Sequence, residues 1–258
     1  AVYHGPDGLR GIGERVPRLT RVLADGLGAL GIECEHRDFF DTLSLRLPPG
    51  MSDCFRVRAV EAGLLFRYVD EVRVGLALDE TTTESDVAEI VAVAAAVMER
   101  EAPTLKFGSV ESVPTWPSAL VRQSKFLTHP VFHRYRSETE MMRYLKRLER
   151  RDIGLDTSMI PLGSCTMKLT AASAIRPVSW PEYADLHPFA PQDLAVGYQE
   201  VFSEFEESLC TITGLPAVSL QPNSGAQGEF AGLMVIRAYQ RDRDRVDRDV
   251  VLIPASAH

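Results

Sequence analysis

The first stretch that could do chemistry is a turn of small residues, Asn223–Gly228. It lies between an apolar run at Ala217–Leu220 and a helical pattern at Glu229–Gln240. Such a turn at a helix N-terminus exposes backbone N–H groups at the positive end of the helix dipole, which suits a phosphate. Gly225 permits close backbone approach, and Ser224 can add a hydroxyl. A plain βα turn without a ligand is the alternative, and the spacing matches neither a dinucleotide-binding GxGxxG nor a P-loop.

A second candidate is the loop Gly163–Lys168. It brings the hydroxyls of Ser164 and Thr166, the thiol of Cys165 and the amine of Lys168 into one short segment. Four interpretations compete: a cysteine nucleophile, a Schiff-base lysine, a loop that lines a ligand pocket, and a structural loop. Loops carry function more often than cores do. Because Cys165 has no recognisable His or Asn partner pattern, a structural loop is the default.

The histidines give a third candidate, His258, which follows the apolar run Val250–Ile253. If that run is a strand of a parallel sheet, His258 lies at its carboxyl end, where ligands of open α/β sheets bind. A lone histidine is more often a surface or structural residue, so both interpretations stay open. His129 and His187 each precede a proline, and we expect them to pack loops.

The composition excludes several classes of protein. The chain has 258 residues, of which 45% are apolar and 25% charged, and this is ordinary for a globular protein. A net charge of −8 argues against nucleic-acid binding, and no apolar run is long enough to span a membrane. Four cysteines without CxxC spacing predict reduced thiols and no metal site. Because the chain begins with Ala1 and stops just after an apolar run, we expect a segment of a longer protein.

Helical and strand patterns share the first hundred residues. Apolar residues recur every three or four positions from residue 8 to 31, which predicts a helix that either kinks or begins at Pro17. Thr83 and Asp86 resemble a capping box that begins a second helix, Glu84–Arg100. Three strands and a short helical stretch are predicted between these helices: Thr42–Leu47, Gly63–Tyr68, Val72–Leu78 and Val57–Glu61. We therefore expect a compact α+β unit.

A stretch rich in proline and serine follows and predicts a domain boundary. The expected organisation is a domain at 1–102, a linker at 103–124 and a second domain at 125–258. The second domain is predicted to contain helices at Ser137–Arg150, with Ser137 as N-cap, and at Tyr198–Thr213, ended by Gly214. Strands at Ala217–Leu220 and Val250–Ile253 around the helix Glu229–Gln240 would make a βαβ unit. The predicted fold class is therefore α/β with a parallel sheet.

Several longer runs resemble a known family. These runs are Tyr3–Pro6, Leu78–Thr83, Phe126–Phe132, Ser137–Met141, Ser158–Lys168, Leu186–Pro191, Ser219–Leu233 and Val251–His258. They resemble the P-protein family of the glycine cleavage system, and the resemblance covers essentially the whole chain. One departure is Thr170, where the family usually has Asn.

The resemblance implies a fold type I pyridoxal 5'-phosphate enzyme built from two related halves. Residues 1–102 would end the first half with its small α+β domain, and residues 125–258 would open the second, cofactor-binding half. The Schiff-base lysine of the family lies beyond His258, so Lys168 is not that lysine, and this segment alone is expected to be inactive. Residues Ser224, Gly225, Ala226 and Gln227 would cradle the cofactor phosphate, and His258 would stack on the pyridine ring. Ser164, Cys165, Thr166 and Lys168 would line the substrate pocket.

The implied activity is glycine decarboxylation with transfer of the aminomethyl group to the lipoyl arm of H-protein. A homodimer is expected, in the cytoplasm of a bacterium or in the mitochondrial matrix of a eukaryote. Nucleic acid, membrane and metal are not expected partners. One alternative is another fold type I pyridoxal-phosphate amino-acid decarboxylase without a lipoyl partner. The other is a non-catalytic relative of the same fold.

Overall fold

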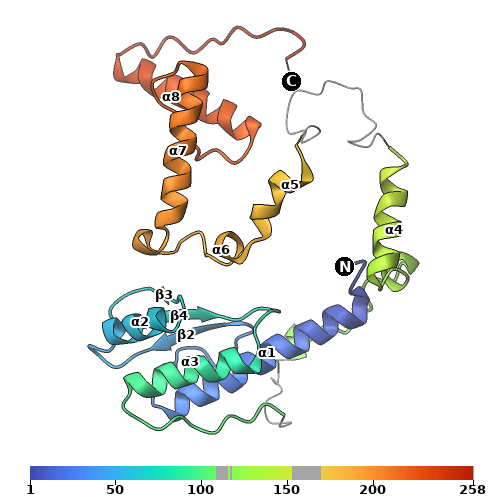
Figure 1. Ribbon diagram of the computed structural model, residues 1–258, viewed down its shortest axis with the longest axis vertical. Helices are drawn as coiled ribbons and strands as arrows, with labels where there is room; N and C mark the ends of the chain where they lie inside the picture. Colours follow the sequence, from blue (N-terminus) through green and yellow to red (C-terminus); the bar gives the residue numbers. More distant parts are fainter. Residues whose placement is uncertain (109–115, 117, 153–169, 258) are drawn as a thin grey trace. The chain divides into compact units, whose positions relative to one another are not determined.

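The computed structural model describes residues 1–108, 116, 118–152 and 170–257 (Figure 1). The chain divides into two compact units, Ala1–Asp152 and Ile153–His258. The described residues form eight α-helices and one small sheet. The predicted α/β class is therefore confirmed in the sense that the chain contains both helices and strands.

The first unit is built on a four-stranded antiparallel sheet with the strand order β1-β2-β4-β3. The two central strands, β2 and β4, pair over five residues, with Ser44 opposite Gly75. Helices α1 and α3 pack against each other. The bounds of the elements are Gly5–Ala29 for α1, Glu33–Cys34 for β1, Thr42–Arg46 for β2, Ser52–Glu61 for α2, Arg67–Tyr68 for β3, Arg73–Ala77 for β4 and Glu84–Val97 for α3.

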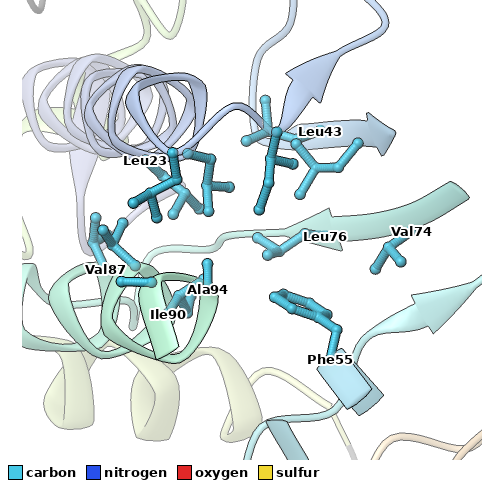
Figure 2. Packing of buried hydrophobic residues seen from close by; sticks show 14 of the residues in the cluster. Leu23, Leu43, Phe55, Val74, Leu76, Val87, Ile90 and Ala94 are labelled. Atoms are coloured by element: carbon cyan, nitrogen blue, oxygen red, sulfur yellow. The ribbon is translucent and has the colours of Figure 1, made fainter. Parts of the chain in front are cut away.

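The core of this unit forms where the alternating faces of the strands meet the apolar stripes of the helices. Every second residue of β2 and β4 is buried, as expected for a sheet with one covered face. Figure 2 shows side chains from both strands and from three helices facing one another. They include Leu23 of α1, Leu43 of β2, Phe55 of α2, Leu76 of β4 and Ile90 of α3. The predicted α+β unit is therefore present.

The start of α3 confirms the predicted capping box. The Thr83 hydroxyl accepts from the backbone N–H of Asp86 at 3.2 Å, and the Asp86 carboxylate accepts from the backbone N–H of Thr83 at 2.7 Å. The helix ends at Val97, three residues before the predicted end, because Glu99 adopts a positive φ of 51°. The Arg100 side chain then donates to the carbonyl of Leu30 at 3.0 Å.

The helix predicted over residues 8–31 is present as α1. Of the two alternatives at Pro17, a start there is excluded, because Pro6 already occupies the first turn, where a missing N–H costs nothing, and the helix continues through Pro17. One local prediction in this unit was wrong. The predicted strand Gly63–Tyr68 shrinks to β3. Gly63 has a φ of +74°, and the N–H of Leu64 donates to the carbonyl of Ala59 at 2.8 Å, so these residues end α2 and do not begin a strand.

The first unit extends past the predicted linker at 103–124 and ends at Asp152. It includes the short turns η2 (Ser118–Leu120) and η3 (Pro130–His133) and the helix α4 (Glu138–Glu149), which begins at the predicted N-cap Ser137. The segment before α4 contacts α1. Arg136 pairs with Asp7 of α1 at 3.5 Å and donates to the carbonyl of Phe132 at 3.4 Å. The assignment of 1–102 and 125–258 to two halves of a longer enzyme stays a prediction.

Gly5 is the residue that allows this contact. Its φ is +61°, and a Cβ at this position would lie 2.5 Å from Nη2 of Arg136 and 2.6 Å from the carbonyl oxygen of Phe132. We expect Gly5→Ala to lower the free energy of unfolding by about 1–3 kcal/mol, because the backbone strain and the clash act together. Urea unfolding of the two proteins measures the difference. Gly11→Ala is the matched control in the same helix. No heavy atom lies within 4 Å of a Cβ there, and the change should be neutral or stabilise by up to about 1 kcal/mol.

The loop before α3 depends on one carboxylate. Asp79 accepts from the backbone N–H of Thr81 at 2.8 Å and from that of Thr82 at 3.2 Å, and it also accepts from the Thr81 hydroxyl. These hydrogen bonds, the Thr81 hydroxyl first, lower the pKa of Asp79 below its usual 3.8. Arg15 of α1 holds the same loop by donating to the carbonyls of Glu80 and Thr82.

A pH dependence follows from the lowered pKa of Asp79. The stabilisation that the Asp79 carboxylate gives to the folded state is complete above the pKa of this group in the unfolded chain. It is lost as the pH falls through the lower pKa of this group in the folded protein. We therefore expect Asp79→Asn to reduce stability most near pH 6 and progressively less as the pH falls below about 4. Urea midpoints of both proteins across that range test this. A difference that stays constant down to the acid limit would contradict it.

The second unit is helical in its described part. Its helices are α5 (Ala172–Ile175), η4 (Arg176–Ser179), α6 (Pro181–Ala184), η5 (Gln192–Leu194), α7 (Val196–Thr213) and α8 (Gly225–Asp242). Helix α7 ends at Gly214, which has a φ of +69°, as predicted. None of the helices in the described ranges is long and apolar enough to cross a membrane.

The predicted βαβ unit is not formed by the described residues. Residues 217–220 and 250–253 adopt no strand, although the helix between them is present. A strand must exchange backbone hydrogen bonds with a neighbour, and neither segment has such a neighbour among the described residues. The side chains of the second segment are correspondingly exposed, Leu252 at 94%. The prediction of a parallel sheet here is therefore wrong for the structure described.

Candidate functional site

The N-terminus of α8 is the part of the candidate site that the structure describes. Ser224 is extended and forms the N-cap, and its hydroxyl accepts from the backbone N–H of Gln227 at 3.2 Å. The Gln227 side chain accepts in turn from the backbone N–H of Asn223 at 2.8 Å. These two hydrogen bonds resemble a capping box. They begin the helix at Gly225, four residues before the predicted start at Glu229, so most of the predicted turn is the first turn of α8.

This arrangement leaves donors available to a ligand. The first N–H groups of a helix have no carbonyl one turn earlier to bind, and the helix dipole makes them attractive to an anion. The first turn of α8 has no acidic side chain that could bind these N–H groups in place of a ligand. No heavy atom lies within 4 Å of the position where a Cβ would stand on Gly225. The residues 223–227 are exposed, so the first turn is open to a phosphate-sized group.

The other predicted site residues lie outside the described residues. This applies to the loop Gly163–Lys168, with its four named side chains Ser164, Cys165, Thr166 and Lys168, and to His258. Their roles stay predictions. Residues 250–253 form no strand whose carboxyl end His258 could follow. Its assignment now depends on the family resemblance alone.

The two histidines expected to pack loops have the same local role. Nδ1 of His129 accepts from the backbone N–H of Val131 at 3.2 Å, and Nδ1 of His187 accepts from that of Phe189 at 3.0 Å. In both cases the imidazole closes a His-Pro turn by binding the N–H two residues further on. The prediction of a loop-packing role is confirmed for both.

Sequence reasoning did not identify a hollow in the second unit. It has a volume of about 720 Å³ and lies between α6, η5 and the start of α7. Tyr198 donates from its hydroxyl to the carbonyl of Tyr183 at 2.6 Å, and the two rings meet edge to face. The aromatic residues between 180 and 198 are a visible signal in the sequence, but only the short helices bring them together. The lining residues are Trp180, Pro181, Glu182, Tyr183, Leu186, Leu194, Ala195, Gly197 and Tyr198.

Comparison with known proteins finds a family and several relatives to which the chain is similar. Residues 1–94 match the family described as glycine cleavage system P-protein. The resemblance inferred from the sequence motifs is thereby confirmed. The whole chain is 50% identical to the protein named glycine dehydrogenase (decarboxylating) of Thermosynechococcus vestitus. It is also 50% identical to the protein of that name from Shewanella amazonensis and 48% identical to that from Photobacterium profundum. The chain covers about a quarter of the length of these relatives, 26% of the first and 27% of the other two.

Proposed function

We propose that this chain is part of a glycine dehydrogenase (decarboxylating) of the glycine cleavage system. The observation that carries the proposal is the identity of 48–50% over all 258 residues to three bacterial proteins of that name. The open first turn of α8 supports it, because a phosphate-bearing cofactor needs an anion site of this kind. The proposed enzyme has fold type I and acts as a homodimer in the cytoplasm.

In the proposed reaction glycine loses its carboxyl carbon as carbon dioxide. The remaining aminomethyl carbon forms a bond to one sulfur of the lipoyl disulfide on H-protein. The disulfide bond breaks, and the second sulfur becomes a thiol. The lipoyl group is therefore the oxidant, and no other electron acceptor is needed.

The residues of α8 fit the phosphate of pyridoxal 5'-phosphate. The backbone N–H groups of Gly225 and Ala226 and the Ser224 hydroxyl would hold it, while Gln227 keeps the turn closed through its bond to Asn223. When bound, this cofactor supplies an electron sink for loss of carbon dioxide. The lysine that would bind it covalently is expected beyond this sequence. Ser164, Cys165, Thr166 and Lys168 are proposed to line the substrate pocket.

His258 is proposed to stack on the cofactor ring. A planar imidazole can hold the ring's tilt without adding a fixed charge. In the full-length enzyme we expect His258→Phe to keep much of the cofactor affinity and His258→Ala to lose it. Cofactor absorption spectra and affinity of both variants provide the measurement. If His258→Ala matches the unchanged enzyme in both, the histidine is only structural.

The function itself is tested with the full-length protein and carboxyl-labelled glycine. Release of labelled carbon dioxide should require both the cofactor and lipoylated H-protein, and it should fall to background when unlipoylated H-protein is supplied. Release that is independent of H-protein would favour the alternative, a pyridoxal-phosphate decarboxylase without a lipoyl partner. No release under any condition would favour a non-catalytic relative.

A further inference from the structure

Helix α4 and the residues just before it form a basic region in an acidic protein. Residues 134–151 contain seven basic and three acidic side chains, whereas the whole chain has a net charge of −8. Two of these cations have carboxylate partners, Arg136 with Asp7 and Lys146 with Glu149. Arg134 and Arg147 have no carboxylate partner among the described residues. Their positive charges are therefore not neutralised by this part of the chain.

Two tyrosines hold Arg147 in place. The rings of Tyr135 and Tyr144 stack with their centroids 4.2 Å apart and their planes 13° from parallel. The guanidinium carbon of Arg147 lies 5.2 Å from the centroid of the first ring and 5.3 Å from that of the second. The same guanidinium donates a hydrogen bond to the Tyr135 hydroxyl. An arginine fixed in this way by ring faces and a hydrogen bond loses less freedom when it binds an anion.

A second guanidinium reaches the same phenol. Hydrogen bonds from Arg147 and then from Arg134 lower the pKa of the Tyr135 hydroxyl below its usual 10. Because each guanidinium carries five N–H donors, most donors of both arginines remain after these bonds. Two cations that converge on one oxygen also repel each other, and a carboxylate placed beside them would relieve that repulsion.

Apolar side chains lie along the same helix. Met142, Leu145 and Leu148 are 63%, 49% and 40% exposed. Leu148 lies one turn after Tyr144, so the apolar stripe borders the tyrosine pair. Aromatic residues, arginine and methionine together are typical of protein–protein interfaces. A free anion would use the guanidiniums alone and would leave these apolar side chains uncovered.

We propose that Arg134, Tyr135, Tyr144, Arg147 and Leu148, here called the α4 surface, dock an acidic segment of a partner protein. The carboxylates of the partner bind the two guanidiniums, and its apolar side chains cover Leu148 and its neighbours. A nucleic acid is a poorer fit, because its charge continues along its length and meets the net negative charge of the rest of the chain. The proposal does not depend on the proposed activity, since docking needs neither glycine nor cofactor.

The test is binding of a fluorescent twelve-residue peptide of alternating Glu and Leu to the full-length protein, measured by anisotropy at low salt. Arg147→Gln should weaken binding about threefold to fivefold, the range expected of an exposed charge pair. Tyr135→Phe keeps every charge but removes the oxygen that gathers the guanidiniums, and it should weaken binding about twofold. Arg56→Gln is the matched control. Arg56 also lies over a tyrosine, Tyr68 at 4.3 Å, but in a hollow lined by Asp53, Asp70 and Glu71. This variant should bind as the unchanged protein does.

Four outcomes would overturn the proposal. In the first, Arg147→Gln and Arg56→Gln have the same effect, which makes the interaction one of net charge only. In the second, the peptide with Gln in place of Glu binds equally well. In the third, inorganic phosphate binds with the same dependence on Arg147 while the acidic peptide does not. In the fourth, a duplex DNA of equal charge binds more tightly than the peptide.

Discussion

Replacing Phe55 by alanine is expected to remove about 3–5 kcal/mol from the free energy of unfolding of the first unit. Phe55 is fully buried, and its ring stacks on that of Phe66 with the centroids 5.6 Å apart. It is the one large side chain that α2 inserts among the residues of the sheet and α3 (Figure 2). The truncation loses the transfer free energy of the ring and leaves a cavity that the backbone of a sheet cannot close. Since domains are stable by about 5–15 kcal/mol, a large part of the stability would be lost.

The measurement is urea unfolding of the full chain followed by hydrogen exchange, with peptides from α1 and α3 reporting on this unit. Phe40→Ala is the matched control, because it removes the same atoms from a ring that is 47% exposed and stacks on Trp116. It should cost about 1 kcal/mol or less. Equal losses in the two variants would contradict the assignment of Phe55 to the core.

Gly225→Val should weaken the binding of pyridoxal 5'-phosphate to the full-length protein about tenfold or more. A side chain at Gly225 would fill the space that the structure leaves open beside the first N–H groups of α8. Each hydrogen bond to a charged group is worth about 1.5–3 kcal/mol, and 1.4 kcal/mol corresponds to a factor of ten. Loss of one such bond is therefore sufficient. Cofactor absorption during titration measures the affinity.

The matched control for this experiment is Gly197→Val. Gly197 also lies in the first turn of an eighteen-residue helix, α7, and a Cβ there would likewise meet no heavy atom within 4 Å. The two variants share the same change in helix propensity, so they differ only in the site that they would obstruct. If both lower cofactor affinity equally, the phosphate does not bind at the α8 terminus.

The parts of the fold that local chemistry decides could be predicted from sequence. Thr83 with Asp86, Ser137, and Gly214 mark helix ends through hydrogen bonds and φ values that involve only a few neighbouring residues. The strand predictions at 217–220 and 250–253 failed because a strand exists only with a partner, which no local pattern supplies. The strand β1 was not predicted because two residues give no alternation to detect.

The candidate site also has a part that could be predicted from the local sequence and a part that could not. The two glycines, Gly225 and Gly228, have weak helix propensity, and they led to a predicted turn where a helix begins. The signal for the start of the helix was present in the sequence, since Ser224 and Gln227 have the spacing of a capping box. The identity of the ligand is not a local property. The roles of Gly163–Lys168 and His258 rest on resemblance, because nothing in their spacing separates a pocket from a structural loop.

The length of α1 has a consequence for how the first unit can move. The helix has 25 residues, which corresponds to a rod of about 37 Å. Its second half, from Val16 to Leu27, is buried against the core, while Asp7 near its start pairs with Arg136, and α1 contacts η3. A rod fixed at one end works as a lever. A small rotation of α1 where it packs on α3 would therefore displace Gly5 by several ångströms. In the opposite direction, a force on residues 130–136 would be transmitted through α1 to the sheet. The segment before α4 is therefore mechanically connected to the core through a contact, Asp7 with Arg136, whose partners are 129 positions apart in the sequence.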